Sequence, residues 1–284
     1  MRQLVIADGP IEVTLLPEAG ARLHRLRAFG HDLLRTPDDP DAHVRDPFFW
    51  GAYVMAPWCN RIPAAPTPVA GRIVDVRANF ADGSAIHGQV AAARWTPDVD
   101  GTTCQVLAGE DGWPWAYEAT MAATIDGAQL VLDVSVLNRS DGPMPAGVGL
   151  HPWWRRPVRV GVRATSVYPS NVRPPDVPVP VGNRFNLRRP TDPPRGLDAT
   201  WTGRSGPIEL EWPELGVAGT LTCSSSADHV AIATPDDPDA TAVEIQTHAP
   251  DGLRRLQLGL PGAMHVLGPG ERLGLTATLT VRQR

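Results

Sequence analysis

The 284-residue chain contains no lysine, so every basic side chain is an arginine or a histidine. Schiff-base catalysis, pyridoxal-phosphate anchoring and P-loop nucleotide binding each need the flexible amine of a lysine. The sequence therefore excludes these three kinds of chemistry. A nucleotide composition that favours arginine codons is the simplest cause, and the exclusion holds whatever the cause.

Cysteine is scarce as well. The three cysteines, Cys59, Cys104 and Cys223, lie far apart, are odd in number and form no CxxC pair. A disulfide framework or a thiolate metal site is therefore not expected. Small buried side chains are the simpler interpretation.

Long apolar runs and basic runs are also missing. No run approaches the roughly 20 apolar residues that a membrane-spanning helix needs. The N-terminal segment MRQLVIADGP is unlike a signal peptide, so we expect a cytoplasmic protein. The net charge of −5 argues against nucleic acid as a partner. A hydrophobic fraction of 42% is typical of an ordered chain with a substantial core.

Proline and glycine are abundant instead. The 30 prolines and 27 glycines are spread along the chain and leave little room for long helices. Between them lie short runs rich in β-branched residues: 11–17, 71–80, 129–138, 208–212, 229–235, 241–247 and 273–282. In the run 129–138 we expect one buried face made of Leu130, Leu132, Val134 and Val136, with Val131, Asp133 and Ser135 on the other. The pattern predicts an all-β fold, a large antiparallel β-sandwich with few short helices, formed by a single domain over residues 1–284.

One segment does not fit the strand pattern. Residues 173–195, RPPDVPVPVGNRFNLRRPTDPPR, are rich in proline and charge and show little periodicity. The segment is longer than most connections between strands, which favours a functional loop over an ordinary turn.

Local catalytic motifs are few. None of the eight histidines belongs to an HExxH or HxH motif, so the sequence encodes no local metal site, although distant histidines can still assemble one. No GxSxG nucleophile motif is present, and the GVG at 147–149 lacks the rest of a dinucleotide fingerprint.

Polar residues at strand ends are the remaining candidates. Asn60 and Arg61 lie in MAPWCNRIP, His87 follows the strand-like SAIHG, and His151 closes the apolar MPAGVGLHP. Glu244 lies within a predicted strand, on the face opposite Val243 and Ile245. Each has an ordinary alternative: a structural histidine, a loop hydrogen-bonding pair or a glutamate that faces solvent.

Taken as an ordered set, these residues resemble the aldose 1-epimerase (galactose mutarotase) family. The order is NRIP, then IHG, then LHPWW at the end of a strand, and finally VEIQTHAPDG near the C-terminus. The opening VTLLPEAGARLHRLRAFGHDLL and the mid-chain DGWPWAYEATMAATI are also similar to that family, so the resemblance runs nearly end to end.

The resemblance implies a large antiparallel β-sandwich that interconverts the α and β anomers of a free aldose such as glucose or galactose, without cofactor or metal. Carried over by motif, Glu244 corresponds to the general base and His151 to the general acid. A base must take the proton of the C1 hydroxyl while an acid protonates the ring oxygen. We therefore expect the two side chains to converge on the sugar from opposite sides.

Substrate-binding roles follow from the same resemblance. Arg61 and His87 match sugar-contacting residues, with Asn60 supporting Arg61. Asp198, in GLDATWTG, resembles the aspartate that holds sugar hydroxyls, because it too precedes an aromatic residue. Trp153 or its neighbour Trp154 is our choice for a sugar contact.

The glycines beside His151 also need an explanation. We expect Gly147 and Gly149 to let the backbone lie close beneath the sugar.

Departures from the family pattern leave alternatives open. Trp153-Trp154-Arg155 stands where the family commonly has an aromatic residue followed by Phe-Asn, and Ile245 stands where a proline is usual. One alternative is a mutarotase for hexose 6-phosphates, whose phosphate could be held by arginines 155, 156, 188 or 189. The other is a non-catalytic carbohydrate-binding protein. In all cases we expect a small sugar as the ligand, no nucleic acid or membrane partner, and a monomer or weak homodimer.

Overall fold

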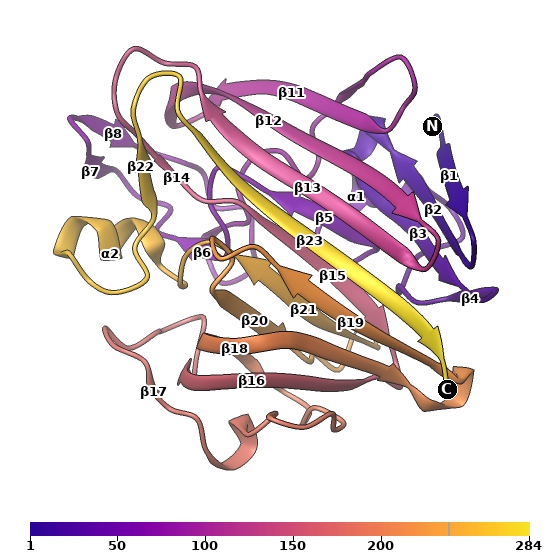
Figure 1. The fold of residues 1–284 in the computed structure, drawn as a ribbon. Coiled ribbons are helices and arrows are strands. Elements are labelled where there is room, and N and C mark those ends of the chain that lie inside the picture. The colour runs from indigo at the N-terminus through magenta and orange to yellow at the C-terminus, as the bar shows by residue number, and fades with distance from the viewer. Residues whose placement is uncertain (238) are drawn as a thin grey trace.

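Strands dominate the computed structural model, which describes residues 1–237 and 239–284 (Figure 1). Strands make up 51% and helices 7% of the structure, which confirms the predicted all-β class. The strands of the first half are β1 (Leu4–Asp8), β2 (Ile11–Leu16), β3 (Arg22–Ala28), β4 (His31–Asp32), β5 (Ala52–Met55), β6 (Arg61–Ile62), β7 (Thr67–Val69), β8 (Arg72–Val74), β9 (Ala85–Ile86), β10 (Thr96–Pro97), β11 (Thr103–Glu110), β12 (Trp113–Asp126) and β13 (Gln129–Asn138).

The second half continues in the same way. Its strands are β14 (Met144–Ala146), β15 (Gly149–Arg155), β16 (Arg159–Tyr168), β17 (Val179–Pro180), β18 (Asp198–Trp212), β19 (Val217–Cys223), β20 (His229–Ala233), β21 (Ala240–Gln246), β22 (His265–Leu267) and β23 (Arg272–Gln283). The helices are α1 (Ala42–Arg45), α2 (Gly252–Leu258) and the 3-10 turns η1 (Pro17–Ala19), η2 (Asn183–Phe185) and η3 (Pro213–Leu215). None of the helices in the described part is long and apolar enough to cross a membrane.

Seventeen strands join one large, curled antiparallel sheet. Strands β3, β5, β15, β21, β20 and β18 follow one another across one part of it. The long strand β18 pairs with β20 through its first residues and with β19 through its last ones. From β19 the sheet continues through β23, β13 and β12 to β11, and Figure 1 shows these last four strands running side by side. A single strand thus connects the two halves of the sheet.

The alternation predicted for residues 129–138 holds only in part. Leu130, Val134 and Val136 are buried and Asp133 is exposed, but Val131 and Leu132 are both half-buried and residues 134–138 are all buried. Ser135 is thus buried on the face predicted to be open. Its hydroxyl hydrogen-bonds Thr120 at 2.6 Å and accepts from Arg272 at 2.6 Å, which satisfies a polar group in that position.

Two predicted segments need comment. The run 71–80 forms a strand only over β8, since the chain then leaves the hairpin and Asp75 N–H bonds the carbonyl of Gly112.

The proline-rich segment 173–195 is anchored rather than free: Arg255 of α2 donates to the carbonyls of Pro175 at 2.7 Å and Asp176 at 2.8 Å. Its suggested functional role stays a prediction.

Candidate active site

Strand register brings His151 and Glu244 together. In the pairing of β15 with β21, Leu150 lies opposite Ile245 and Trp153 opposite Ala242, so His151 lies opposite Glu244. On the other side of β15, Tyr53 of β5 pairs with His151. Residues directly opposite each other on antiparallel strands share one face of the sheet. The register therefore places Tyr53, His151 and Glu244 in one cross-strand row.

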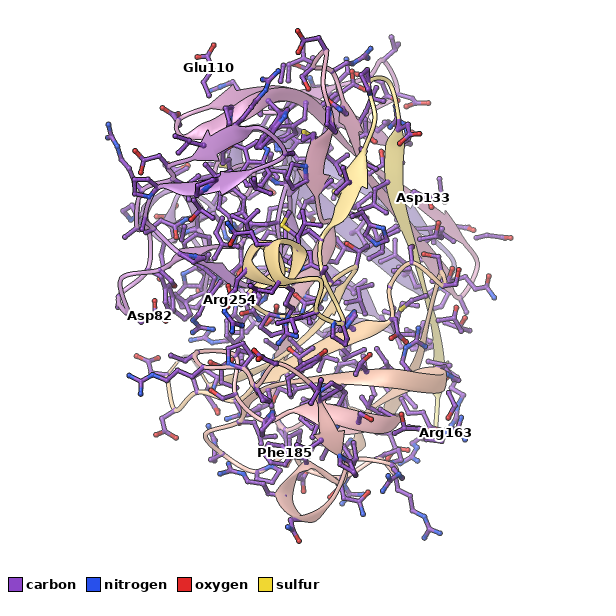
Figure 2. The ribbon with its side chains drawn as sticks, turned by 90° about the vertical axis from the view of Figure 1, so that its left-hand side faces the viewer. Asp82, Glu110, Asp133, Arg163, Phe185 and Arg254 are labelled. Carbon is purple, nitrogen blue, oxygen red and sulfur yellow. The ribbon has the colours of Figure 1, made fainter. Side chains whose placement is uncertain are left out.

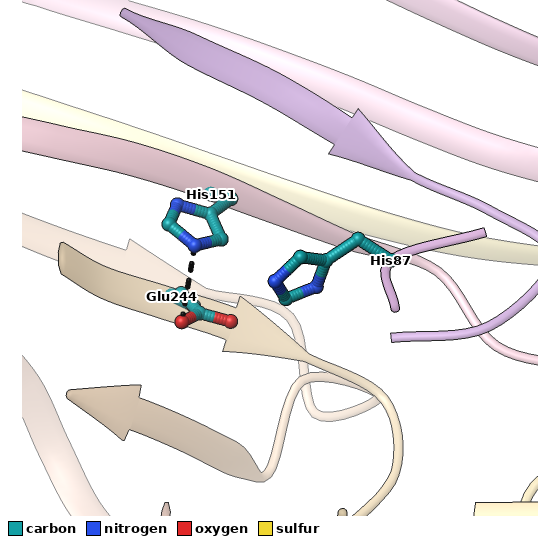
Figure 3. Close-up of side chains that lie close together, drawn as sticks. All are labelled: His87, His151 and Glu244. Atoms are coloured by element: carbon teal, nitrogen blue, oxygen red, sulfur yellow. Dashed lines mark ion pairs between the residues drawn. The ribbon is translucent and has the colours of Figure 1, made fainter. Parts of the chain in front are cut away.

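The two candidate catalytic side chains are in direct contact (Figure 3). His151 Nε2 lies 3.2 Å from Glu244 Oε1, and both side chains are almost fully buried. The alternative that Glu244 faces solvent is therefore wrong. The expectation that the pair converges from opposite sides is also wrong, because the two residues project from neighbouring strands.

Burial decides the charge of this pair. It raises the pKa of Glu244 to about 8, helped by nearby Asp198 and opposed by Arg61. It lowers the pKa of His151 to about 3, an effect that Arg22 reinforces. At neutral pH these shifts favour a protonated carboxyl beside a neutral imidazole. Among the described residues, Glu244 Oε2 and His151 Nδ1 are buried without a hydrogen-bond partner.

A third side chain, His87, points toward this pair (Figure 3). His87 and Asn60 exchange two hydrogen bonds: Asn60 N–H donates to His87 Nδ1 at 3.2 Å, and His87 N–H donates to the Asn60 carbonyl at 3.0 Å. Because Nδ1 accepts, the ring proton lies on Nε2, which is thus a donor. Gly88 allows the close turn, since a β-carbon there would overlap the backbone of Ala56.

Arg61 is held between two carboxylates. Its Nε donates to Asp82 at 2.6 Å, and its Nη1 lies 3.3 Å from Asp198. Asn60 Oδ1 also accepts from the backbone N–H of Arg61 at 2.9 Å. Figure 2 labels Asp82 at the margin of the molecule, on the loop between β8 and β9. The guanidinium is therefore fixed in orientation before any ligand arrives.

Asp198 is fixed in turn by Asn171. The amide of Asn171 donates to Asp198 Oδ1 at 2.7 Å, and its oxygen accepts from Thr200 at 2.8 Å. Asn171 is only 1% exposed. One oxygen of Asp198 is thus held by an amide and the other by Arg61.

The candidate catalytic and binding side chains open onto one cavity of about 260 Å³. Its lining includes all seven residues selected from the sequence: Asn60, Arg61, His87, His151, Trp153, Asp198 and Glu244. The volume is below the roughly 300–1,000 Å³ of pockets for drug-sized ligands. The cavity is therefore sized for a small ligand.

Two expectations for the GVGLHPWW segment are corrected. A β-carbon on Gly147 would overlap the ring of His248, and one on Gly149 would lie 2.6 Å from the Ile245 carbonyl oxygen. The glycines therefore make room for neighbouring protein groups. Trp154 lies on the other face of β15, where it packs on Trp212 at 5.6 Å between ring centroids.

Trp153 belongs to the cavity wall. Its indole N–H donates to the carbonyl of Phe48, and its ring lies 5.7 Å from the ring of Phe49. Only 3% of the residue is exposed, so it offers an edge of the wall rather than an open stacking face.

His87, His151 and Glu244 also form a group of possible metal ligands. Each offers one possible ligand atom, and these atoms lie within 4.8 Å of one another. The Nδ1 lone pair of His87 already accepts from Asn60, and Nε2 carries the ring proton. His87 thus has no free lone pair for a cation, and we assign the cluster no metal.

Several lining residues were not found from the sequence. Phe48, Phe49, Tyr53 and Phe80 line the cavity, but aromatic residues in an apolar run look like core residues. Asp82 and Asn171 are not part of the lining. They hold Arg61 and Asp198, respectively, and lie in loops with no motif. The four aromatic residues carry no sequence signal that separates them from buried packing.

Comparisons with known proteins identify the family and the fold. The family model described as aldose 1-epimerase matches residues 3–278. The fold is similar to that of a putative aldose 1-epimerase from Escherichia coli K12, with a TM-score of 0.85, 20% identity, and coverage of 100% of this chain and 99% of the other.

Two further solved structures are similar. One is a galactose mutarotase-like protein from Clostridium acetobutylicum, with a TM-score of 0.84, 17% identity and coverage of 99% and 95%. The other is an aldose epimerase homologue from C. elegans, with a TM-score of 0.82, 17% identity and coverage of 99% of both chains. A search of curated protein sequences gave no significant match. Since the family model spans nearly the whole chain, the protein belongs to the aldose 1-epimerase family.

Proposed function

We propose that this protein catalyses anomer exchange of a free aldose, with Glu244 and His151 as the acid–base pair. The observation that carries the proposal is the 3.2 Å contact between the Glu244 carboxyl and the His151 imidazole, both of which line one cavity of about 260 Å³. Binding alone needs no such pair.

The geometry suits the reaction. Ring opening removes a proton from the C1 hydroxyl and adds one to the ring oxygen, and both oxygens are bonded to the same carbon. A donor and an acceptor that lie side by side can therefore serve the two oxygens at once. Rotation about the C1–C2 bond and reversal of both transfers then give the other anomer.

The resting pair holds one proton, and burial places it on Glu244. In that state Glu244 donates to the ring oxygen while His151 accepts from the C1 hydroxyl. Ring closure reverses both transfers, so each residue acts as acid and as base within one turnover. The family assignment, with Glu244 as base and His151 as acid, describes the same pair with the proton on the imidazole.

The other lining groups would bind the sugar. Arg61 and His87 offer donors to hydroxyls, and Asp198 offers an acceptor. Arg61 is already oriented by Asp82 and Asp198, so little side-chain entropy is lost when a sugar binds.

A free sugar fits this site better than a sugar phosphate. Arg61 is the one arginine among the described residues that line the cavity, and two carboxylates already engage it. Arginines 155, 156, 188 and 189, considered above for a phosphate, are not part of the lining.

Anomer exchange measured by two-dimensional exchange NMR tests the proposal. Glucose, galactose and glucose 6-phosphate should be compared at matched concentrations, with enzyme-free buffer as the reference. We expect exchange of a free sugar well above the buffer rate. Binding with exchange at the buffer rate would support the carbohydrate-binding alternative, and a strong preference for glucose 6-phosphate would support the phosphate alternative.

The pH dependence of exchange is a first prediction. The pair has both a donor and an acceptor only while it holds one proton. The pKa values predict that this state persists from about pH 3 to about pH 8. We expect kcat/KM to be flat between pH 5 and pH 7 and to fall about tenfold per pH unit above 8, after subtraction of the base-catalysed buffer rate. A rate that rises through pH 8, or an acidic limb near pH 6.5, would contradict this.

Replacing Asn171 with alanine gives a second prediction. The change removes the donor that holds Asp198 Oδ1, so Asp198 should bind the sugar less well. We expect KM to rise about 5- to 30-fold, which corresponds to about 1–2 kcal/mol for a lost hydrogen bond, with a smaller change in kcat. Steady-state exchange kinetics would measure both constants. A fall in kcat with KM unchanged would place Asn171 in another role.

A further inference from the structure

Arg22, at the start of β3, is a fully buried cation behind the cavity. Its guanidinium donates to the carbonyl of Trp50 at 2.7 Å, to that of Ala91 at 3.2 Å, and to that of Pro47. No carboxylate lies within ion-pair distance of it among the described residues. Asp46 attracts Arg22 only from beyond ion-pair distance, and a buried charge without a direct ion pair is costly. Its presence therefore calls for a compensating role.

The register places Arg22 in the row that leads to the catalytic pair. Leu23 of β3 pairs with Ala52 of β5, so Arg22 lies opposite Tyr53. The guanidinium carbon lies 4.7 Å from the centroid of the Tyr53 ring. Tyr53 in turn stacks on the imidazole of His151, with 4.5 Å between centroids and 20° between planes. The row across β3, β5, β15 and β21 is therefore Arg22, Tyr53, His151, Glu244.

We propose that Arg22 is a positioning residue, which uses the Tyr53 ring to orient His151 and its charge to keep His151 neutral, so that the shared proton rests on Glu244. The order of the four residues in the row determines which protonation state Arg22 favours. Neighbouring strands lie about 4.8 Å apart, and Arg22 is two strands from His151 but three from Glu244. A cation there opposes a charged imidazole more than it stabilises a charged carboxylate. The state with neutral His151 and protonated Glu244 is therefore favoured over the ion pair.

Other groups also face His151, and none replaces Arg22. His87 approaches from the loop after β9, with 4.8 Å between the ring centroids, and Glu244 approaches from β21. Arg61 and Asp198 lie beyond Glu244, where they shift its pKa in opposite directions. His87 is neutral because burial, His151 and Arg61 all lower its pKa. Arg22 is thus the fixed positive charge on the His151 side of the pair.

The test is the protonation of His151 measured by ¹⁵N NMR of the imidazole in the sugar-free protein. In the parent protein we expect a neutral ring throughout pH 5–8. In Arg22→Met, the titration of His151 should move upward from about pH 3 by about one unit or more, because a nearby cation is removed, so the ring is followed down to about pH 3 in every protein. In Arg22→Lys, which keeps the charge, His151 should titrate at the same pH as in the parent protein.

Arg255 supplies a matched control. It is also fully buried, donates to the carbonyls of Pro250 and Pro261, and lies 4.4 Å from the ring centroid of Tyr168. Arg255→Met therefore loses a comparable buried cation away from His151. We expect it to leave the His151 titration unchanged.

The titration of His151 in the Arg22 variants can contradict the inference directly. If His151 titrates at the same pH in Arg22→Met as in the parent protein, the inference is wrong. If Arg22→Met does not fold, Arg22→Gln, whose amide can still donate to the carbonyls, takes its place with the same expectation. The measurement needs no catalysis, so its result does not depend on the proposed function. If exchange is confirmed, the acidic limb of kcat/KM should also lie at higher pH in Arg22→Met than in the parent protein.

Discussion

Glu244→Gln should lower the protein-catalysed rate of anomer exchange by about 10²–10⁴-fold, the usual contribution of one positioned acid–base group. Glutamine has the shape of the protonated carboxyl but cannot give up or regain a proton. The cavity should therefore keep its form and its affinity for sugar, while the transfer to and from the ring oxygen is lost. Exchange NMR at pH 7 measures the rate, and ligand-observed NMR measures binding.

Glu12→Gln is a suitable control for this substitution. It makes the same chemical change on β2, at a side chain that is 43% exposed and outside the cavity lining. Its exchange rate should equal that of the parent protein. If Glu244→Gln kept the parent rate while folded, the proposed role of Glu244 would be wrong.

Glu244→Gln should also alter the stability of the folded protein, in a direction set by the pKa of Glu244. That pKa is raised to about 8 in the folded protein, above its ordinary value of 4.5. Its contribution to stability is therefore fully present below pH 4.5 and is lost as the pH rises through 8. Glutamine does not ionise. We expect Glu244→Gln to raise Tm relative to the parent by more at pH 8.5 than at pH 4.5, as measured by calorimetry.

Much of this fold follows from local sequence pattern. The period-two alternation in residues 129–138 and the scattered prolines and glycines are enough to predict an antiparallel all-β chain. The pattern fails where tertiary contacts decide, as at Ser135, which is buried because Thr120 and Arg272 satisfy its hydroxyl. It fails again after Val74, where a backbone hydrogen bond to Gly112 ends the hairpin.

The site residues also differ in whether local sequence predicts them. The seven residues selected from motifs all line one cavity, because a polar residue at a strand end or beside glycine carries a local signal. Arg22 and Tyr53 carry none, since their significance lies in strand register between distant segments. The mutual geometry of His151 and Glu244 also depends on register. That is why the sequence suggested opposite sides, and the structure shows neighbouring strands.

His151→Asn should lower exchange by about 10²–10⁴-fold as well, because asparagine keeps a polar side chain but cannot carry the proton taken from the C1 hydroxyl. The more telling measurement is the double variant His151→Asn/Glu244→Gln. If the two residues acted independently, their effects would multiply. In the proposed mechanism the two proton transfers occur together, so either single change already blocks ring opening, and the second change has little left to remove. We therefore expect the double variant to exchange anomers about as fast as the slower single variant. Multiplied losses would mean that the two side chains serve separate steps, and the concerted mechanism would then be wrong.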